Sequence, residues 1–213
     1  MTFFEVLVEG ASDVPAVHEV LTRRFGLSEN HHFRVHRHHG RGRLPRDLLG
    51  QPDPRRRGLL DQLPAKLRGW AGLGPSVCVL VVIDVDDEPC AELLLQLNRM
   101  LERLPRRPKR VLFRLAIEET ESWFIADTRA VKAAFPRADV RRLARIPADA
   151  VVGAAEHLAR ALGKDPDRMT GADKFGWASA IAPHLDLVDP PSPSLARLIG
   201  AISREVDGTE GRE

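Results

Sequence analysis

The strongest constraint on the fold is an apolar run that ends in acidic residues. Residues 79–83 read Val-Leu-Val-Val-Ile, and Asp84, Asp86 and Asp87 follow directly. An unbroken run of this kind is typical of a strand buried on both faces, as in a parallel sheet covered by helices. The three acids then fall at the carboxyl end of that strand, where open α/β sheets bind their ligands.

Two interpretations of this acidic run follow from the residues alone. Carboxylates this close repel one another unless a cation, a proton or a basic ligand neutralises them, and hard oxygen ligands suit Mg²⁺ or Mn²⁺. In the alternative, the run is a solvated turn whose first Asp caps the following helix.

The rest of the first 136 residues alternates strands with helices. Strands are expected at residues 3–8, 33–35, 77–83 and 110–116, and helices at residues 14–25, 59–70, 89–104 and 120–135. This alternation predicts an α/β fold with a parallel or mostly parallel sheet and right-handed crossovers. Ser12 or Asp13 is expected to cap the first helix.

Beyond Pro136 the pattern changes to short helices separated by Pro and Gly, expected at residues 147–162, 177–184 and 194–206. We therefore expect an α/β domain over residues 1–136 and a helical extension over residues 137–213 that packs on it.

Length and composition indicate a globular protein of the cytoplasm. The chain has 213 residues, and none of its apolar stretches approaches the length of a membrane span. Its first residues predict a strand, not a signal peptide. Cys78 and Cys90 are expected to be thiols, although a disulfide between them is the alternative.

The net charge is only +2, but basic residues gather in one segment. Residues 31–57 hold eight Arg, five His and two acids. Within it, residues 37–57 predict a long, mobile loop that suits a phosphate backbone. The expected nucleic-acid contacts are Arg34, Arg37, Arg41, Arg43, Arg55, Arg56 and Arg57. A solvated loop is the alternative, and the histidines of residues 31–39 leave zinc binding open.

Acids follow each of the three best strands. Glu9 follows the first, Asp84 and Asp86 follow the third, and residues 118–121 (Glu-Glu-Thr-Glu) follow the fourth. Parallel strands bring their carboxyl ends to one edge of the sheet, so these acids are expected to converge there.

These motifs resemble a known fold family. Residues 8–13 (Val-Glu-Gly-Ala-Ser-Asp) look like the glutamate motif that opens a Toprim domain, and residues 83–87 look like its DxD motif. Residues 118–127, with Glu121 and Trp123, are similar to a block of the Toprim-like DUF4276 family of small bacterial proteins. Lys174 and the serines of residues 192–194 resemble that family's later signature. The resemblance covers most of the chain.

The resemblance implies a Toprim-like fold and a Mg²⁺- or Mn²⁺-dependent nuclease. Glu9 would be a metal ligand or a general acid/base, Asp84 and Asp86 would bind metal, and Glu121 would add a ligand. Lys174 would stabilise the negative charge that develops during cleavage. The implied partners are nucleic acid, DNA rather than RNA, and a separately encoded ATPase, in phage defence or DNA repair. The chain lacks Tyr, so a tyrosyl intermediate is excluded.

Two other functions stay open. An apolar strand followed by Asp-x-Asp also opens the HAD phosphohydrolases, but there the motif lies on the first strand. A non-catalytic Toprim-like module that binds metal, nucleotide or a partner is the other. Asp87 and Asp127 are interpreted as caps of the helices that follow them, whatever the function.

Overall fold

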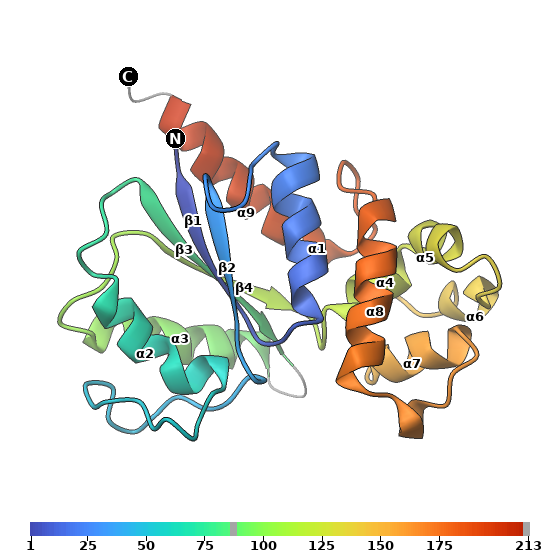
Figure 1. Cartoon of the computed structure of the whole chain (residues 1–213), viewed down its shortest axis with the longest axis horizontal. Helices are drawn as coiled ribbons and strands as arrows, with labels where there is room; N and C mark the ends of the chain where they lie inside the picture. The colour runs from blue at the N-terminus through green and yellow to red at the C-terminus, as the bar shows by residue number, and fades with distance from the viewer. Residues whose placement is uncertain (86–88, 211–213) are drawn as a thin grey trace.

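The computed structural model describes residues 1–85 and 89–210, and its centre is a sheet of four parallel strands (Figure 1). The strands lie in the order β2-β1-β3-β4. Their bounds are β1 (Phe3–Val8), β2 (Phe33–Arg37), β3 (Val77–Asp84) and β4 (Val111–Ala116). The predicted α/β class is confirmed, and every strand in the described residues runs parallel to its neighbours.

Helices cover both faces of this sheet. One face carries α1 (Asp13–Glu19), which continues as a π-helical turn over Val20–Arg24, and α9 (Pro193–Glu210). The other carries α2 (Leu59–Gly69) and α3 (Cys90–Arg103).

The apolar run of β3 supplies side chains to both cores. Leu80 and Val82 pack toward α1 and α9, whereas Val79, Val81 and Ile83 pack toward α2 and α3. The strand is therefore buried on both faces, as its uninterrupted hydrophobicity predicts.

The connections around β1 create a topological switch point. The chain passes from β1 to β2 through α1 on one face, and from β2 to β3 through α2 on the other. β1 and β3 are neighbours, so their connections leave in opposite directions at the carboxyl edge. In this class of fold, ligands usually bind between the carboxyl ends of two such strands.

The remaining helices gather beside the carboxyl edge (Figure 1). They are α4 (Glu121–Ala126), α5 (Thr128–Ala134), α6 (Val140–Leu143), α7 (Ala154–Ala161) and α8 (Gly171–Ile181). Trp177 and Ala178 of α8 share one hydrophobic core with β1 and α1. Within the described residues, no helix combines the length and apolarity that a bilayer span requires.

Two expected helices differ from those observed. The helix predicted over residues 120–135 breaks at Asp127, whose carboxylate accepts a hydrogen bond from the Ala130 amide at 3.0 Å and so caps α5. The cap predicted at Asp127 is thus confirmed. The helix predicted from Pro147 begins only at Ala154, because Gly153 adopts φ +76° and starts a new helix there.

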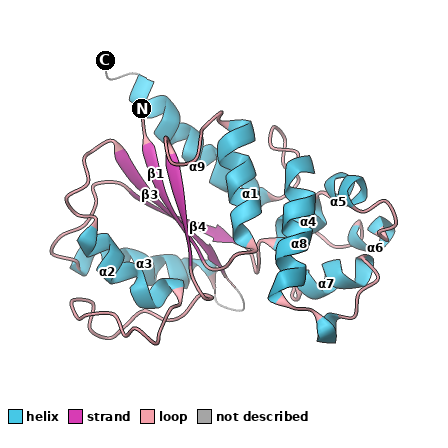
Figure 2. Ribbon diagram, in the orientation of Figure 1, coloured by secondary structure: helices cyan, strands magenta, loops and turns pink. Residues whose placement is uncertain are grey.

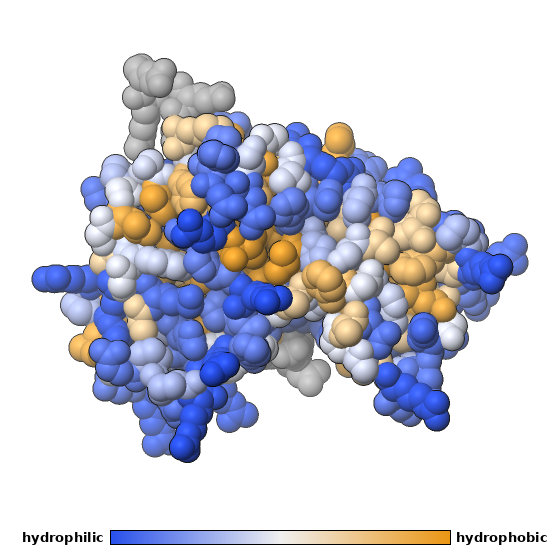
Figure 3. All heavy atoms as spheres, viewed as in Figure 1, coloured by the Kyte–Doolittle hydropathy of each residue, from blue (hydrophilic) through white to orange (hydrophobic). Residues whose placement is uncertain are grey.

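The basic segment after β2 has little regular structure and passes beneath α2 (Figure 2). Figure 3 shows that this lower left part of the surface is strongly hydrophilic. The segment is tied to the domain at several points: the Gly40 amide donates to the Glu9 carbonyl at 2.9 Å, and Arg68 of α2 donates to the carbonyls of Leu48 and Gly50.

Candidate acidic site at the carboxyl edge

The ends of β1 and β3 are joined by a carboxylate. Glu9 is buried directly after β1, and its Oε1 accepts a hydrogen bond from the Asp84 backbone amide at 2.9 Å. The predicted convergence of these two acids at one edge of the sheet is therefore observed.

Asp13 adds a further buried carboxylate at this edge of the sheet. Its Oδ2 accepts a hydrogen bond from the Gly10 amide at 2.7 Å, and its Oδ1 accepts one from the Thr120 hydroxyl at 2.9 Å. Ser12 makes no side-chain cap, and Asp13 bonds to these groups outside the helix, so the capping role expected for either residue is wrong. Asp13 instead links the segment after β1 to the segment after β4.

Asp84 has the strongest electrostatic perturbation of the site. The residue keeps partial exposure, yet burial of its carboxyl group raises its pKa well above the usual range. The negative charges of Asp13, Glu9, Glu121 and Glu119 raise it further. Burial likewise raises the pKa of Asp13. Acids that share an edge in this way cannot all ionise without a compensating cation.

Lys174 of α8 supplies one such cation. Its Nζ donates to Glu119 Oε1 at 2.7 Å and lies 3.3 Å from Glu121 Oε1. Burial alone would lower the pKa of Lys174, but Glu121 and Glu119 together outweigh it, so the pKa is raised and the lysine stays charged.

Glu121 is the most deeply buried of these acids, with 1% of its surface exposed. Burial raises its pKa to about 7, against the opposing charge of Lys174. Although Oε1 forms an ion pair with Lys174, no described residue donates a hydrogen bond to it. This oxygen is therefore the least satisfied acceptor of the site.

Two of the acids after β4 also have a structural task. Glu118, at φ +62°, accepts hydrogen bonds from the amides of Gly153 and Ala154 at the start of α7. Glu119 accepts another from the Ala155 amide at 3.1 Å. Of the acids predicted after β4, Glu118 thus bonds to the start of α7, Glu121 pairs with Lys174, and Glu119 does both.

The chemistry of the donor set suits a hard divalent ion, since all its acids offer carboxylate oxygens. The buried, unsatisfied Oε1 of Glu121 fits the same interpretation. In the part of the chain that the structure describes, however, no three His, Cys, Asp or Glu side chains are placed to hold one ion together. Asp86, the other predicted ligand, and Asp87, the predicted cap, lie outside the described residues.

The arginines predicted to contact nucleic acid lie in two different places on the fold. Arg41 reaches the acidic edge, where its Nη1 donates to the Val85 carbonyl at 3.4 Å. The others are exposed on β2 or on the segment beneath α2: Arg34, Arg37, Arg43, Arg55, Arg56 and Arg57.

The histidines of residues 31–39 are engaged separately. His36 Nε2 lies 2.6 Å from Glu5 Oε2, His38 Nδ1 lies 2.8 Å from the Val8 carbonyl oxygen, and His32 Nδ1 accepts from the Ser28 amide. No metal-holding group forms among them within the described residues. The two cysteines are free thiols.

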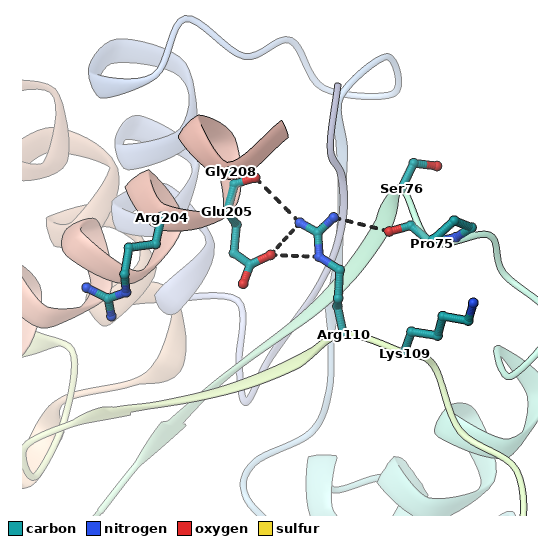
Figure 4. A pocket seen from close by; sticks show the side chains of 7 residues that line it. All are labelled: Pro75, Ser76, Lys109, Arg110, Arg204, Glu205 and Gly208. Carbon is teal, nitrogen blue, oxygen red and sulfur yellow. Dashed lines mark hydrogen bonds and ion pairs between the residues drawn. The ribbon is translucent and has the colours of Figure 1, made fainter. Parts of the chain in front are cut away.

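A second charged cluster lies at the opposite, amino edge of the sheet, beside a cavity of about 630 Å³ (Figure 4). There Arg110 pairs with the Glu205 carboxylate and donates to the Thr2 hydroxyl and the Pro75 carbonyl. Arg110 and Glu205 form the ion pair of this cluster, and Lys109 and Arg204 also line the cavity.

The sequence signal for most of the acidic site was present. Glu9, Asp84 and Glu121 follow or open recognisable elements, and Lys174 was expected near them. Asp13 lies within the motif at residues 8–13, so its four-residue spacing from Glu9 was the available signal for it. Thr120 and the double role of Glu119 had no comparable signal.

Comparison with known proteins identifies the family of the chain but no function. Neither curated proteins nor solved structures gave a match. A family model described as a domain of unknown function, DUF4276, matches residues 8–203, which includes every residue of the acidic site. The chain belongs to the DUF4276 family.

Proposed function

We propose that this protein is a Toprim-like, Mg²⁺- or Mn²⁺-dependent phosphodiesterase that cleaves nucleic acid, DNA rather than RNA. The observation that carries the proposal is the cluster of five acids, Glu9, Asp13, Asp84, Glu119 and Glu121, around one lysine at the switch point of a parallel sheet. An excess of buried carboxylates at this position is what a divalent cation would neutralise.

Glu9, Asp84 and Asp86 are the proposed ligands of that cation. When bound, the ion would neutralise a phosphodiester oxygen and activate the attacking water. The Asp84 amide already orients the Glu9 carboxylate at 2.9 Å, so one ligand is held by the backbone of the next. Burial and the neighbouring acids raise the pKa of Asp84, and a bound cation would favour its charged form.

Lys174 and Glu121 act beside the proposed ligands Glu9 and Asp84. Lys174 is held in its charged form by two carboxylates, which suits a group that stabilises a developing oxyanion. Glu121, with a pKa of about 7, can hold or release a proton near neutral pH, and in this proposal it serves as a proton store or a further ligand.

The exposed arginines would bind the nucleic-acid backbone. Arg41 links their segment to the acidic edge through the Val85 carbonyl, so a strand bound along it is directed to the site. An ATPase, if the reaction uses one, would be a separate protein. A role in phage defence or DNA repair in the cytoplasm is consistent with such an enzyme.

Purified protein incubated with single- and double-stranded DNA and with RNA, in Mg²⁺ or Mn²⁺, tests the proposal. Asp84→Asn keeps the shape of the side chain and removes its charge, so cleavage should fall by about 100-fold or more. Asp189→Asn is the matched control, because Asp189 is exposed and is not one of the acids of the cluster, and it should cleave like the wild type.

Other results distinguish the alternative functions. The nuclease assignment would be overturned if Asp84→Asn still cleaves nucleic acid. It would also be overturned if the cleavage activity separates from this protein during purification. Calorimetric Mn²⁺ binding that Asp84→Asn abolishes, without any cleavage, would identify a non-catalytic binding module. Hydrolysis of p-nitrophenyl phosphate that depends on Asp84, without nuclease activity, would favour a HAD-like phosphohydrolase.

A further inference from the structure

The outer edge of β4 has unused backbone hydrogen-bonding groups. The amides of Val79 and Val85 on β3 donate to the carbonyls of Arg110 and Ala116. In a parallel ladder, alternate residues bond to the same side, so the even-numbered residues of β4 face β3 and Phe113, Leu115 and Ile117 face outward. No strand among the described residues pairs with this outer edge.

This edge forms the floor of a groove between two helices. A cavity of about 630 Å³ lies along β4, with Leu94 of α3 on one side and Ala196 and Gly200 of α9 on the other. Figure 1 shows α3 and α9 on opposite faces of the sheet, so the two sides of the groove come from opposite faces. Gly200 has no side chain, so nothing projects from α9 into the groove at this position.

The two walls of the groove differ in chemistry. Toward α3 it is apolar, with Leu94, Phe113 and Leu115. Toward α9 it is cationic, with Arg114, Arg197 and Arg204, and no Asp or Glu lines it.

The three arginines form no ion pair with an acid of the described residues, although the charge of Glu205 acts on Arg114. Neither Arg197 nor Arg204 forms an ion pair with any residue that the structure describes, and the buried Nε of Arg114 has no hydrogen-bond acceptor there. Burial lowers the pKa of Arg114, and the positive charge of Arg204 lowers it further. Such a cluster is stabilised by added carboxylates.

We propose that the outer edge of β4 binds an extended, acidic segment of a partner protein as a fifth strand. Successive side chains of a strand point to opposite faces. A segment that alternates acidic and aliphatic residues would place its carboxylates against the arginines beside α9 and its aliphatic groups against α3. Its backbone would pair with the outward groups of Phe113 and Leu115.

Charge and polarity favour this occupant over two others. A second copy of the chain, paired edge to edge, would bring Arg114, Arg197 and Arg204 against their own counterparts. Nucleic acid would satisfy the arginines but not the apolar wall or the outward amides of the strand.

A fluorescein-labelled peptide in which Glu alternates with Val tests the proposal by fluorescence anisotropy. It should bind at least about tenfold more tightly than the same peptide with Lys in place of Glu. Arg197→Glu combined with Arg204→Glu should reverse this preference. Hydrogen exchange at the Phe113 and Leu115 amides should slow when the Glu peptide is bound, since these amides become paired.

Gly200→Leu provides a second variant that preserves the fold. A Cβ at this position meets only Arg204 Nη1, at 3.7 Å, so the backbone has room for a side chain, and one added here would project from the lining of the groove. It should abolish peptide binding without lowering the melting temperature. Equal binding of both peptides, binding unaffected by Gly200→Leu, preferential binding of an oligonucleotide at this groove, or a dimer that the double charge reversal dissociates would each overturn the proposal.

Discussion

The two ends of the sheet handle buried charge in opposite ways. At the amino end, Arg110 pairs with Glu205 and donates to the Pro75 carbonyl (Figure 4). Another donor of its guanidinium goes to the Thr2 hydroxyl. At the carboxyl end, Lys174 is the cation that pairs with Glu119 and Glu121, and Asp84 lies among four other acids.

This difference separates a structural cluster from a functional one. A matched pair needs nothing else to be stable, and its side chains have fixed partners. A cluster with excess negative charge stores an unfavourable interaction that a proton or a cation relieves. Burial raises the pKa of both Asp84 and Glu121, and the charges of neighbouring acids raise them further.

The largest expected effect comes from removing the cation of the acidic site. Lys174→Met leaves Glu119 and Glu121 without their partner, and because Glu121 is buried the free energy of unfolding should fall by about 3 kcal/mol at pH 8. At pH 5 the loss should be smaller, because Glu121 can take up a proton. Urea unfolding at both pH values measures this, with exposed Lys132→Met as the control. An equal loss at both pH values would contradict the model of excess negative charge.

The next largest effect is the dependence of the free energy of unfolding on pH, which the carboxyl group of Glu121 causes. Its pKa is raised from the usual 4.5 to about 7, so the folded protein binds a proton more tightly than the unfolded chain. The resulting stabilisation is complete below about pH 4.5 and is lost as the pH rises through 7, a change of about 3 kcal/mol.

Urea unfolding between pH 4.5 and 8 in the presence of EDTA should show this slope. Glu121→Gln should flatten it, whereas Glu92→Gln, an exposed acid on α3, should leave it unchanged. A slope that persists in Glu121→Gln would assign the titration to another acid of the cluster, with Asp13 and Asp84 as the next candidates.

At the matched end of the sheet, a smaller and simpler effect is expected. Arg110→Met removes the partner of Glu205, and the free energy of unfolding should fall by about 2 kcal/mol, since the pair is only partly buried. Cleavage and Mn²⁺ binding should not change. If Arg110→Met impairs Mn²⁺ binding as strongly as Asp84→Asn does, the two ends of the sheet are not separable.

Much of the fold could be predicted because its signals are local. The run at residues 79–83 indicates a buried strand whatever surrounds it, and Gly26, at φ +66°, ends the first helical segment where the sequence indicates. The break at Asp127 and the late start of α7 depend on hydrogen bonds between particular residues, which hydrophobic periodicity does not report.

Only part of the acidic site could be predicted from local signals. Parallel strands place Glu9 and Asp84 together by geometry alone. The link from Asp13 to Thr120 spans 107 positions of the chain and forms only once α1 and the segment after β4 have packed. Capping preference suggested a local role for Asp13, and tertiary packing gave it a different one.

The smallest predicted effect tests whether neighbouring acids of one segment have different roles. Glu118→Gln weakens the hydrogen bonds to the amides of Gly153 and Ala154, so the start of α7 should lose about 1 kcal/mol of stability. Since Glu118 faces α7, cleavage and Mn²⁺ binding should stay at wild-type levels, in contrast to Asp84→Asn. Thermal unfolding and calorimetry of the same preparation measure both quantities. A loss of Mn²⁺ binding with unchanged stability would place Glu118 in the acidic site and move the boundary between structure and function within residues 118–121.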